Sequence, residues 1–135
     1  MNQWPESVAP FVVFTGGEPA LQLDAELIFE LKKIDAEIAI ETNGTLELAD
    51  GIDWICVSPK ANTEIKVTSG NELKLVYPQE GLSPNMLTQL EFDHYYIQPM
   101  DSPFREENTK AAIQYCKSNP QWKLSIQSHK YLNIP

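Results

Sequence analysis

The sequence has 135 residues, 42% of them hydrophobic, and a formal net charge of −9 from 19 acidic and 10 basic side chains. This length and composition suit one domain with a buried core, which we expect to span residues 1–135. The acidic balance, with no basic run, argues against a nucleic-acid or anionic-membrane surface. No apolar stretch approaches the roughly 20 residues of a membrane span, and residues 1–5 are not typical of a signal peptide, so a cytoplasmic location is expected.

The first expected element is a strand over Phe11–Phe14, whose β-branched and aromatic residues predict burial on both faces. It runs directly into Gly16, Gly17, Glu18 and Pro19. One interpretation is a plain strand-to-helix connection, because glycines permit positive φ and Pro19 suits the first turn of a helix. The other is a ligand site, because glycines let a ligand approach main-chain atoms and Glu18 can accept from an ammonium group. Ligands of α/β proteins lie at the carboxyl ends of parallel strands, which favours the second interpretation.

Strands and helices alternate along the rest of the chain. Apolar residues at helical spacing predict a helix after Pro19, at Leu21, Leu23, Leu27, Ile28 and Leu31. Further apolar runs predict strands at Glu37–Glu41, Asp53–Val57, Glu72–Tyr77, His94–Gln98 and Lys123–Gln127. A second helix is expected over Pro103–Lys117, with its charged residues toward solvent. The alternation indicates a parallel α/β sheet or part of a barrel.

Polar or glycine residues follow five of the six expected strands, in the segments 15–18, 41–45, 58–60, 98–101 and 127–129. If the strands are parallel, these segments meet on one side of the sheet. Turn or capping chemistry explains any single one equally well, since Asn43-Gly44 is a common turn pair and Asp101 or Ser102 can cap the next helix. Five such strand ends in one chain favour a shared site.

The two cysteines, Cys56 and Cys116, lie in an apolar strand-like run and near the end of a helix-like one. They are too few and too far apart for a disulfide framework or a cysteine metal motif. We expect both to be small, buried hydrophobic residues.

Six segments carry a resemblance to a known family: TGGEP, IAIETNGT, DWICVSPK, ELKLVYPQ, YYIQPMD and PQWKLSIQSHK, in this order. Together they resemble the radical S-adenosylmethionine (SAM) superfamily and, within it, the 7-carboxy-7-deazaguanine synthase family. TGGEP alone marks the superfamily, whereas the combination, spread from Phe11 to Pro135, is more specific. The resemblance implies an α/β fold, an incomplete TIM-type barrel of about six mainly parallel strands, of which this chain is the C-terminal part.

The activity that the resemblance implies is that of a radical SAM lyase. Such an enzyme converts 6-carboxy-5,6,7,8-tetrahydropterin to 7-carboxy-7-deazaguanine, with loss of ammonia, in queuosine and deazapurine biosynthesis. Family members use SAM, a [4Fe–4S] cluster and Mg²⁺, act on this small-molecule pterin, and are usually homodimers.

Site residues also follow from the resemblance. In the superfamily the glycine-rich motif binds the amino group of the methionine moiety of SAM, so Gly16 and Gly17 would present backbone oxygens to it while Glu18 and Pro19 shape the loop. Thr15 would contact the pterin. Glu41 would accept from the same ammonium or the ribose, although a structural role at a strand end is an alternative. The other implied SAM contacts are Ser58, Pro59 and Lys60 at the carboxylate and ribose, and Gln98, Pro99, Met100 and Asp101 at the adenosine.

One departure from the superfamily pattern concerns the cluster. Members bind it through three cysteines on a loop before the glycine-rich motif, whereas this chain has no cysteine before Cys56. We therefore expect neither cluster nor Mg²⁺ ligands in this chain, and no activity from it alone. Two rival interpretations are a cluster-less SAM- or pterin-binding protein without catalysis, and a radical SAM activase that acts on a protein.

The chain ends in QSHKYLNIP, where we expect no further element after the last strand. A frayed tail is one interpretation. The other is a docked tail, because Tyr131, Leu132 and Ile134 are apolar and Pro135 limits its freedom. A pterin presents adjacent N3–H and 2-amino donors, which suit a carboxylate that accepts two parallel hydrogen bonds. Because the family resemblance also reaches the last residue, we expect the Pro135 carboxylate to contact the substrate and His129 to line the same pocket.

Overall fold

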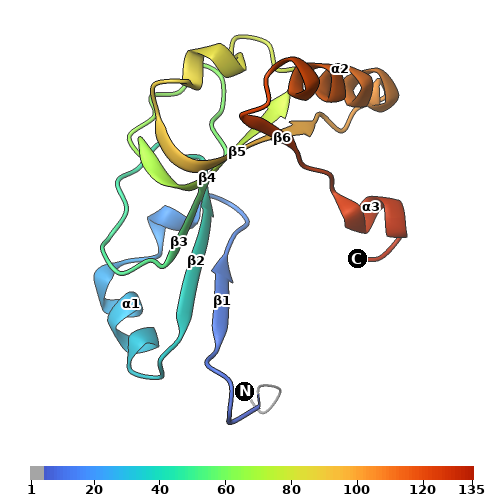
Figure 1. The fold of residues 1–135 in the computed structure, drawn as a ribbon. Coiled ribbons are helices and arrows are strands. Elements are labelled where there is room, and N and C mark those ends of the chain that lie inside the picture. The colour runs from blue at the N-terminus through green and yellow to red at the C-terminus, as the bar shows by residue number, and fades with distance from the viewer. Residues whose placement is uncertain (1–4) are drawn as a thin grey trace.

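The protein, seen in a computed structural model that describes residues 5–135, is built on a single open sheet (Figure 1). Six strands follow one another in sequence order, and every neighbouring pair is parallel. The strands are β1 Phe11–Phe14, β2 Glu37–Thr42, β3 Trp54–Val57, β4 Ser69–Tyr77, β5 Glu91–Pro99 and β6 Trp122–Leu124. This confirms the predicted α/β class with about six parallel strands, and the unpaired outer edges of β1 and β6 fit an incomplete barrel.

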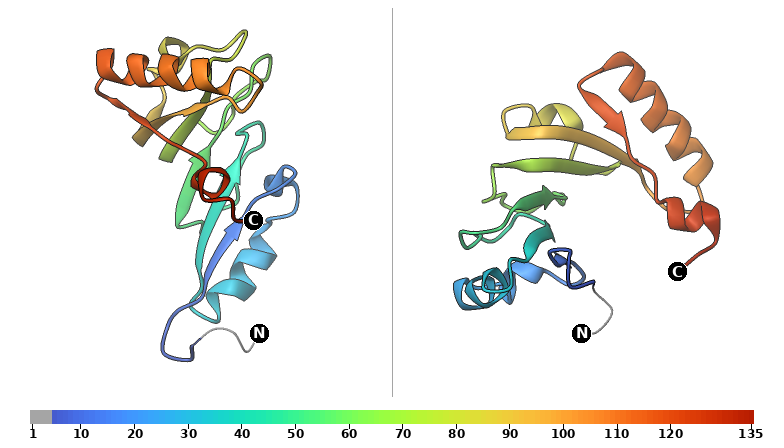
Figure 2. Two further views of the ribbon diagram at one scale, coloured as in Figure 1. Left: turned by 90° about the vertical axis from the view of Figure 1, so that its right-hand side faces the viewer. Right: turned by 60° about the horizontal axis from the view of Figure 1, so that its bottom comes forward.

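The helices are α1 Ala25–Lys32, α2 Arg105–Ser118 and α3 Ser128–Leu132, and there are 3₁₀ turns at Pro19–Leu21 and Pro84–Leu87. The sheet is strongly curved: α1 lies beside β1 and β2 at one end, and α2 covers β5 and β6 at the other (Figure 2). The short α3 lies apart from both, on the open side of the curve. Within the described residues, no helix has the length and apolar character needed to cross a membrane. Residues 1–4, part of the segment judged unlike a signal peptide, lie outside that description.

Two apolar clusters form the core between the sheet and its helices. One joins Leu23 and Ile28 to Ile38 and Ile40 of β2. The larger cluster lies under α2 and includes Leu73, Leu75, Ile97, Ala112 and Trp122. Burial of these apolar side chains is the main stabilising term of such a domain, and it leaves the opposite, concave face of the sheet to other residues.

The expected burial of Phe11–Phe14 on both faces is wrong. Phe11 and Val13 are 48% and 45% exposed, while Phe14 packs against the cluster under α1. The reason is position, because β1 is an edge strand that pairs only with β2 and has cover on one face alone. Strand composition does not reveal which strand becomes an edge.

The helix expected directly after Pro19 is interrupted. Pro19 opens a 3₁₀ turn instead, and α1 begins only at Ala25. Asp24 causes the delay, because its extended backbone sets the start of the helix and its carboxylate accepts from the Leu27 N–H at 2.9 Å. Asp24 is a typical N-cap residue, so the sequence did contain a signal for this helix start. The prediction instead followed the apolar spacing that begins at Leu21.

Two expectations about the end of the chain are also wrong. The last strand ends at Leu124 rather than Gln127, because its pairing with β5 stops at Ile97. A further element then follows, since Ser128–Leu132 form α3. Asn133 ends this helix in the left-handed conformation, and its N–H donates to the His129 carbonyl.

Candidate binding site at the strand ends

The carboxyl ends of the central strands border a cavity of about 400 Å³, called the central cavity below. Five of the predicted site residues line it: Glu41 at the end of β2, Ser58 and Lys60 after β3, Gln98 on β5 and His129 on α3. The parallel sheet thus brings polar strand ends together, as the sequence predicted. Lys74, Val76, Ser125, Ile126, Gln127 and Ser128 complete the lining.

Lys74 is the charged residue of this cavity that was not predicted from the sequence. Its ammonium lies 3.9 Å from a carboxylate oxygen of Glu41 and 3.8 Å from one of Glu72. The alternation along β4 was the available signal, because Leu73 and Leu75 are fully buried in the core and residues 72 and 74 must therefore face the other side. Lys74 lies in the middle of β4, so the pattern of polar residues after strand ends did not indicate it.

The central cavity presents both signs of charge. Lys60 and Lys74 are cations, the Ser58 hydroxyl can donate or accept, and the Glu41 carboxylate accepts. A lysine ammonium is a compact charge with three donors, which suits a carboxylate, and a carboxylate suits an ammonium. The arrangement is therefore suited to a small ligand with both groups, such as the zwitterion of an amino acid.

The glycine-rich loop after β1 is tied to the end of β2 by Glu18. Its carboxylate accepts from the Ala20 N–H at 3.1 Å, from the Asn43 N–H at 2.9 Å, and from the hydroxyl of Thr42, which is the buried polar residue of the core. With three donors from the chain itself, Glu18 acts as the support of the loop. This favours its predicted role in shaping the loop over direct acceptance from a ligand's ammonium.

The two glycines of this loop differ. Gly16 has φ of +102°, a conformation that favours glycine whatever its surroundings. Gly17 has no such φ, and a Cβ built on it would meet no atom within 4 Å. Nothing in the described chain requires glycine at 17, so the open space beside it is consistent with close approach of a ligand.

The loop also has a hollow of its own. Thr15, Gly17, Glu18 and Pro19 line a depression of about 290 Å³. The Thr15 hydroxyl donates to the Glu41 carboxylate at 3.4 Å, and this hydrogen bond joins the loop to the central cavity. Thr15 and Glu41 are therefore in contact, whereas Gly16 lines neither this depression nor the central cavity.

The segment 98–101 leads away from the central cavity. Pro99 is buried, as is Pro59 on the neighbouring connection. The Met100 N–H donates to the Tyr77 carbonyl at 2.8 Å, and its carbonyl accepts from the Asn108 side chain at 3.0 Å. These contacts fix the backbone where β5 leads into α2.

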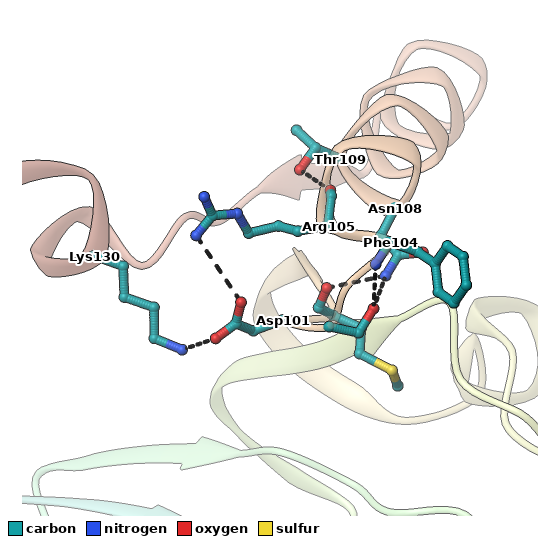
Figure 3. Close-up of polar contacts among 8 residues, drawn as sticks. Asp101, Phe104, Arg105, Asn108, Thr109 and Lys130 are labelled. Atoms are coloured by element: carbon teal, nitrogen blue, oxygen red, sulfur yellow. Dashed lines mark hydrogen bonds and ion pairs between the residues drawn. The ribbon is translucent and has the colours of Figure 1, made fainter.

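The Asp101 carboxylate faces α3 rather than the central cavity (Figure 3). It forms an ion pair with Lys130 and lies 4.0 Å from the Arg105 guanidinium. The hydrogen bond from Lys130 is the main cause that holds the pKa of Asp101 below its ordinary value, and the charges of Lys130 and Arg105 act in the same direction. Asp101, Arg105, Lys130 and Tyr131 border a separate small cleft.

The chain terminus does not share the cavity with His129. Pro135 is exposed and is not among the residues that line the central cavity, whereas His129 is. The residues after α3 would have to turn for the terminal carboxylate to reach a ligand in that cavity.

The cysteines differ in exposure, and neither gives a cluster site. Cys56 is buried as predicted, and burial is the main cause that raises its pKa to about 12. Cys116 is half-buried, which corrects the expectation of full burial, because it lies at the margin of the cluster under α2. Two thiols on separate elements do not fit a [4Fe–4S] cluster held by three or four thiolates. Among residues 5–135, no three His, Cys, Asp or Glu side chains gather in a way that could hold a metal ion.

Comparison with known proteins gives relatives over nearly the whole chain, although no family model matches it. The chain is 55% identical over 133 residues to a 7-carboxy-7-deazaguanine synthase of Burkholderia multivorans, covering 98% of this chain and 63% of the relative. It is 55% identical over 124 residues to the protein of that name from Caulobacter vibrioides, covering 92% and 59%. The corresponding protein of Bacteroides thetaiotaomicron is 37% identical over 123 residues, covering 91% and 64%. The chain therefore spans about three fifths of the length of the curated relatives it matches.

Proposed function

We propose that this chain, whose relatives are 7-carboxy-7-deazaguanine synthases, supplies the SAM- and pterin-binding part of an enzyme with that activity. The relatives confirm the family resemblance predicted from the sequence motifs. Neither rival interpretation, the binding protein without catalysis or the activase, gains support from a structural feature. The observation that carries the proposal is the central cavity, where residues on or just after the five strands β2 to β6 meet the start of α3.

SAM would lie along the strand ends in this proposal. Its methionine ammonium is held by backbone oxygens of Gly16 and Gly17 and by the Glu41 carboxylate, and its carboxylate by Lys60 and the Ser58 hydroxyl. The open space beside Gly17 and the paired charges of the cavity support this placement. Pro59 shapes the loop that carries these two residues, and the segment from Gln98 to Asp101 borders the adenosine. When bound, SAM supplies the radical chemistry, while the protein positions the reacting groups.

The pterin would lie between the glycine-rich loop and α3. Thr15, oriented by its hydrogen bond to Glu41, contacts the substrate on one side, and His129 contacts it on the other. A neutral imidazole offers one donor and one acceptor, which suits the polar edge of a pterin. The Pro135 carboxylate then accepts from the N3–H and 2-amino groups once the terminal segment turns toward the cavity.

Several features of the proposal come from the family alone. They are the homodimer, the [4Fe–4S] cluster and Mg²⁺, whereas the cytoplasmic location is proposed from the sequence pattern. The residues described here do not fit the cluster and offer no metal site, so no step of the reaction is derived through either.

The proposal is tested with a chimera that joins this chain to the part of the Burkholderia multivorans relative that it does not match. After anaerobic reconstitution with iron, sulfide and Mg²⁺, we expect it to convert 6-carboxytetrahydropterin to 7-carboxy-7-deazaguanine in the presence of SAM and a reductant. Lys60→Ala should weaken SAM binding at least about tenfold, the usual effect of leaving one charge of a ligand unpaired.

Lys66→Ala is the matched control, because Lys66 is exposed and does not line the central cavity. It should leave SAM binding within about twofold, as is usual for surface positions. A chimera that binds SAM and pterin without any turnover would support the rival binding protein instead.

A further inference from the structure

We propose that the ion pair between Asp101 and Lys130 is a latch that positions α3 and, with it, His129 beside the central cavity. Asp101 is then a positioning residue, which acts through Lys130. The inference rests on the proposed function, because it links the segment assigned to SAM, 98–101, to the segment assigned to the pterin, 129–135.

The α3 segment has little apolar support. Residues 128–135 are all exposed, including Leu132 at 67%. The backbone hydrogen bonds of the segment are local, from the Lys130 N–H to Gln127 and from the Ile134 N–H to His129. Local hydrogen bonds give the segment its helical form, but they do not fix its place relative to the sheet. Because a helix of five residues is not stable alone in water, release from the sheet would also fray it.

Two side-chain interactions fix that place, within the part of the chain that the structure describes. The Lys130 ammonium pairs with the Asp101 carboxylate, and the Arg105 guanidinium lies over the Tyr131 ring at 5.4 Å from its centre. The same Arg105 approaches Asp101, so the two interactions form one cluster (Figure 3). With so few contacts, loss of one ion pair removes a large part of what holds α3.

The Asp101 side of the latch is firm. The Asn108 side chain donates to the Met100 carbonyl at 3.0 Å and to the Ser102 hydroxyl at 3.1 Å. The Phe104 N–H donates to the same hydroxyl, also at 3.1 Å. These bonds tie residues 100–102 to the start of α2, so the position of Asp101 follows that of the end of β5.

The geometry of a helix turns this latch into a positioning device. Successive residues of an α-helix point about 100° apart. When Lys130 is directed at Asp101, its neighbour His129 therefore points elsewhere, and it lines the central cavity with Glu41 and Lys74. Because Asp101 is held in place, the ion pair with Lys130 sets where His129 faces the cavity, and breaking it should weaken contact with a pterin there.

The latch is tested in the 135-residue chain by amide hydrogen exchange on the millisecond timescale. Lys130→Gln and Asp101→Asn should each speed exchange at Lys130, Asn133 and Ile134 about twofold to fivefold, the range expected for one exposed ion pair. Lys130→Arg keeps the charge and should retain the protection. Lys110→Gln removes a comparable ion pair, 2.9 Å from Glu106 on α2, and should leave these amides unchanged.

Unchanged exchange in both latch variants, or equal loss of protection in Lys130→Arg, would overturn the proposal. In the chimera, Lys130→Gln should raise KM for the pterin about fivefold, on the order of one exposed ion pair, and leave SAM affinity unchanged. Equal effects of Lys110→Gln there would also overturn it. An inactive chimera would count against the proposed function alone, because the exchange measurement decides on the latch without turnover.

Discussion

The glycine-rich loop and the α3 segment lie on opposite sides of the proposed pterin site, yet they are held in different ways. Glu18 holds the loop with three hydrogen bonds, one of them from the buried Thr42 hydroxyl. The α3 segment is exposed and relies on an ion pair and a cation–π contact. Buried, fully paired polar groups are costly to disrupt, whereas exposed ion pairs contribute little to folding. The exposed loop is therefore anchored to the folded core, and α3 is adjustable.

The largest effect is expected from Glu18→Ala. The substitution leaves the Thr42 hydroxyl and two backbone N–H groups without their acceptor, so the free energy of unfolding should fall by about 2–3 kcal/mol. Urea denaturation followed by tryptophan fluorescence measures it. Glu30→Ala removes an exposed carboxylate that pairs with Lys33 on α1, and should cost less than about 0.5 kcal/mol. Equal losses of unfolding free energy in the two variants would show that the Glu18 hydrogen bonds stabilise the chain no more than an exposed ion pair does.

A smaller effect is expected from Gly44→Ala, in the turn that Glu18 supports. Gly44 has φ of +77°, and an added Cβ would lie 2.8 Å from a methyl carbon of Val57. Strain and crowding together should cost about 1–2 kcal/mol in unfolding free energy. Gly17→Ala is the matched variant, with open space and no positive φ, and should change stability by less than about 0.5 kcal/mol. A large loss of stability in Gly17→Ala would mean that the open space is not reserved for a ligand.

Tyr131→Ala tests whether the contacts of α3 contribute to the stability of the fold. It removes the ring under Arg105, an exposed contact, so the free energy of unfolding should change by less than about 0.5 kcal/mol. The same urea titration that is used for Glu18→Ala serves here. A loss above 1 kcal/mol, on the order of a core substitution, would show that α3 belongs to the folding unit and is not adjustable.

The smallest effect is expected from acid. Because the pKa of Asp101 is lowered in the folded chain, its interactions are present at neutral pH and are lost as the pH falls through that lowered value. Exchange at the α3 amides, corrected for its intrinsic pH dependence, should stay constant from neutral pH to about pH 5 and rise only below the ordinary aspartate pKa value of 3.8. Asp101→Asn should abolish this step. If exchange rises by the same amount in Asp101→Asn, the rise is caused by protonation of another carboxyl group.

Much of the fold was predictable because apolar composition indicates buried strands. The exact start and end of each strand, however, depend on the strands that pair with it. The starts Ser69–Asn71 of β4 and Glu91–Asp93 of β5 were missed, since they are mostly polar and enter the sheet through tertiary pairing of Ser69 with Glu91 and of Gly70 with Phe92. Helix α3 was missed although Asn133, with Pro135 soon after, is a helix-end signal. Local composition therefore predicts which segments enter the sheet better than it predicts where they stop.

The candidate site divides in the same way. The strand-end residues Glu41, Ser58 and Gln98 were predictable, because parallel topology gathers strand ends. The partner of Asp101 was not, since Lys130 lies 29 residues away and no local pattern relates the two. The tie between Glu18 and Thr42 likewise depends on tertiary structure, so sequence reasoning found the loop but not what holds it.

The free edge of β1 has a consequence for how the chain behaves in concentrated solution. Among residues 5–135 no strand pairs with its outer backbone N–H and C=O groups, and Phe11 and Val13 beside them are exposed, so the edge can pair with a strand of another copy. Strand pairing acts at contact distance, whereas the net charge of −9 repels other copies over roughly the Debye length, about 10 Å at 0.1 M salt. The chain's colloidal stability is thus set by ionic strength: dilute buffer keeps the edges apart, and added salt screens the repulsion until they meet.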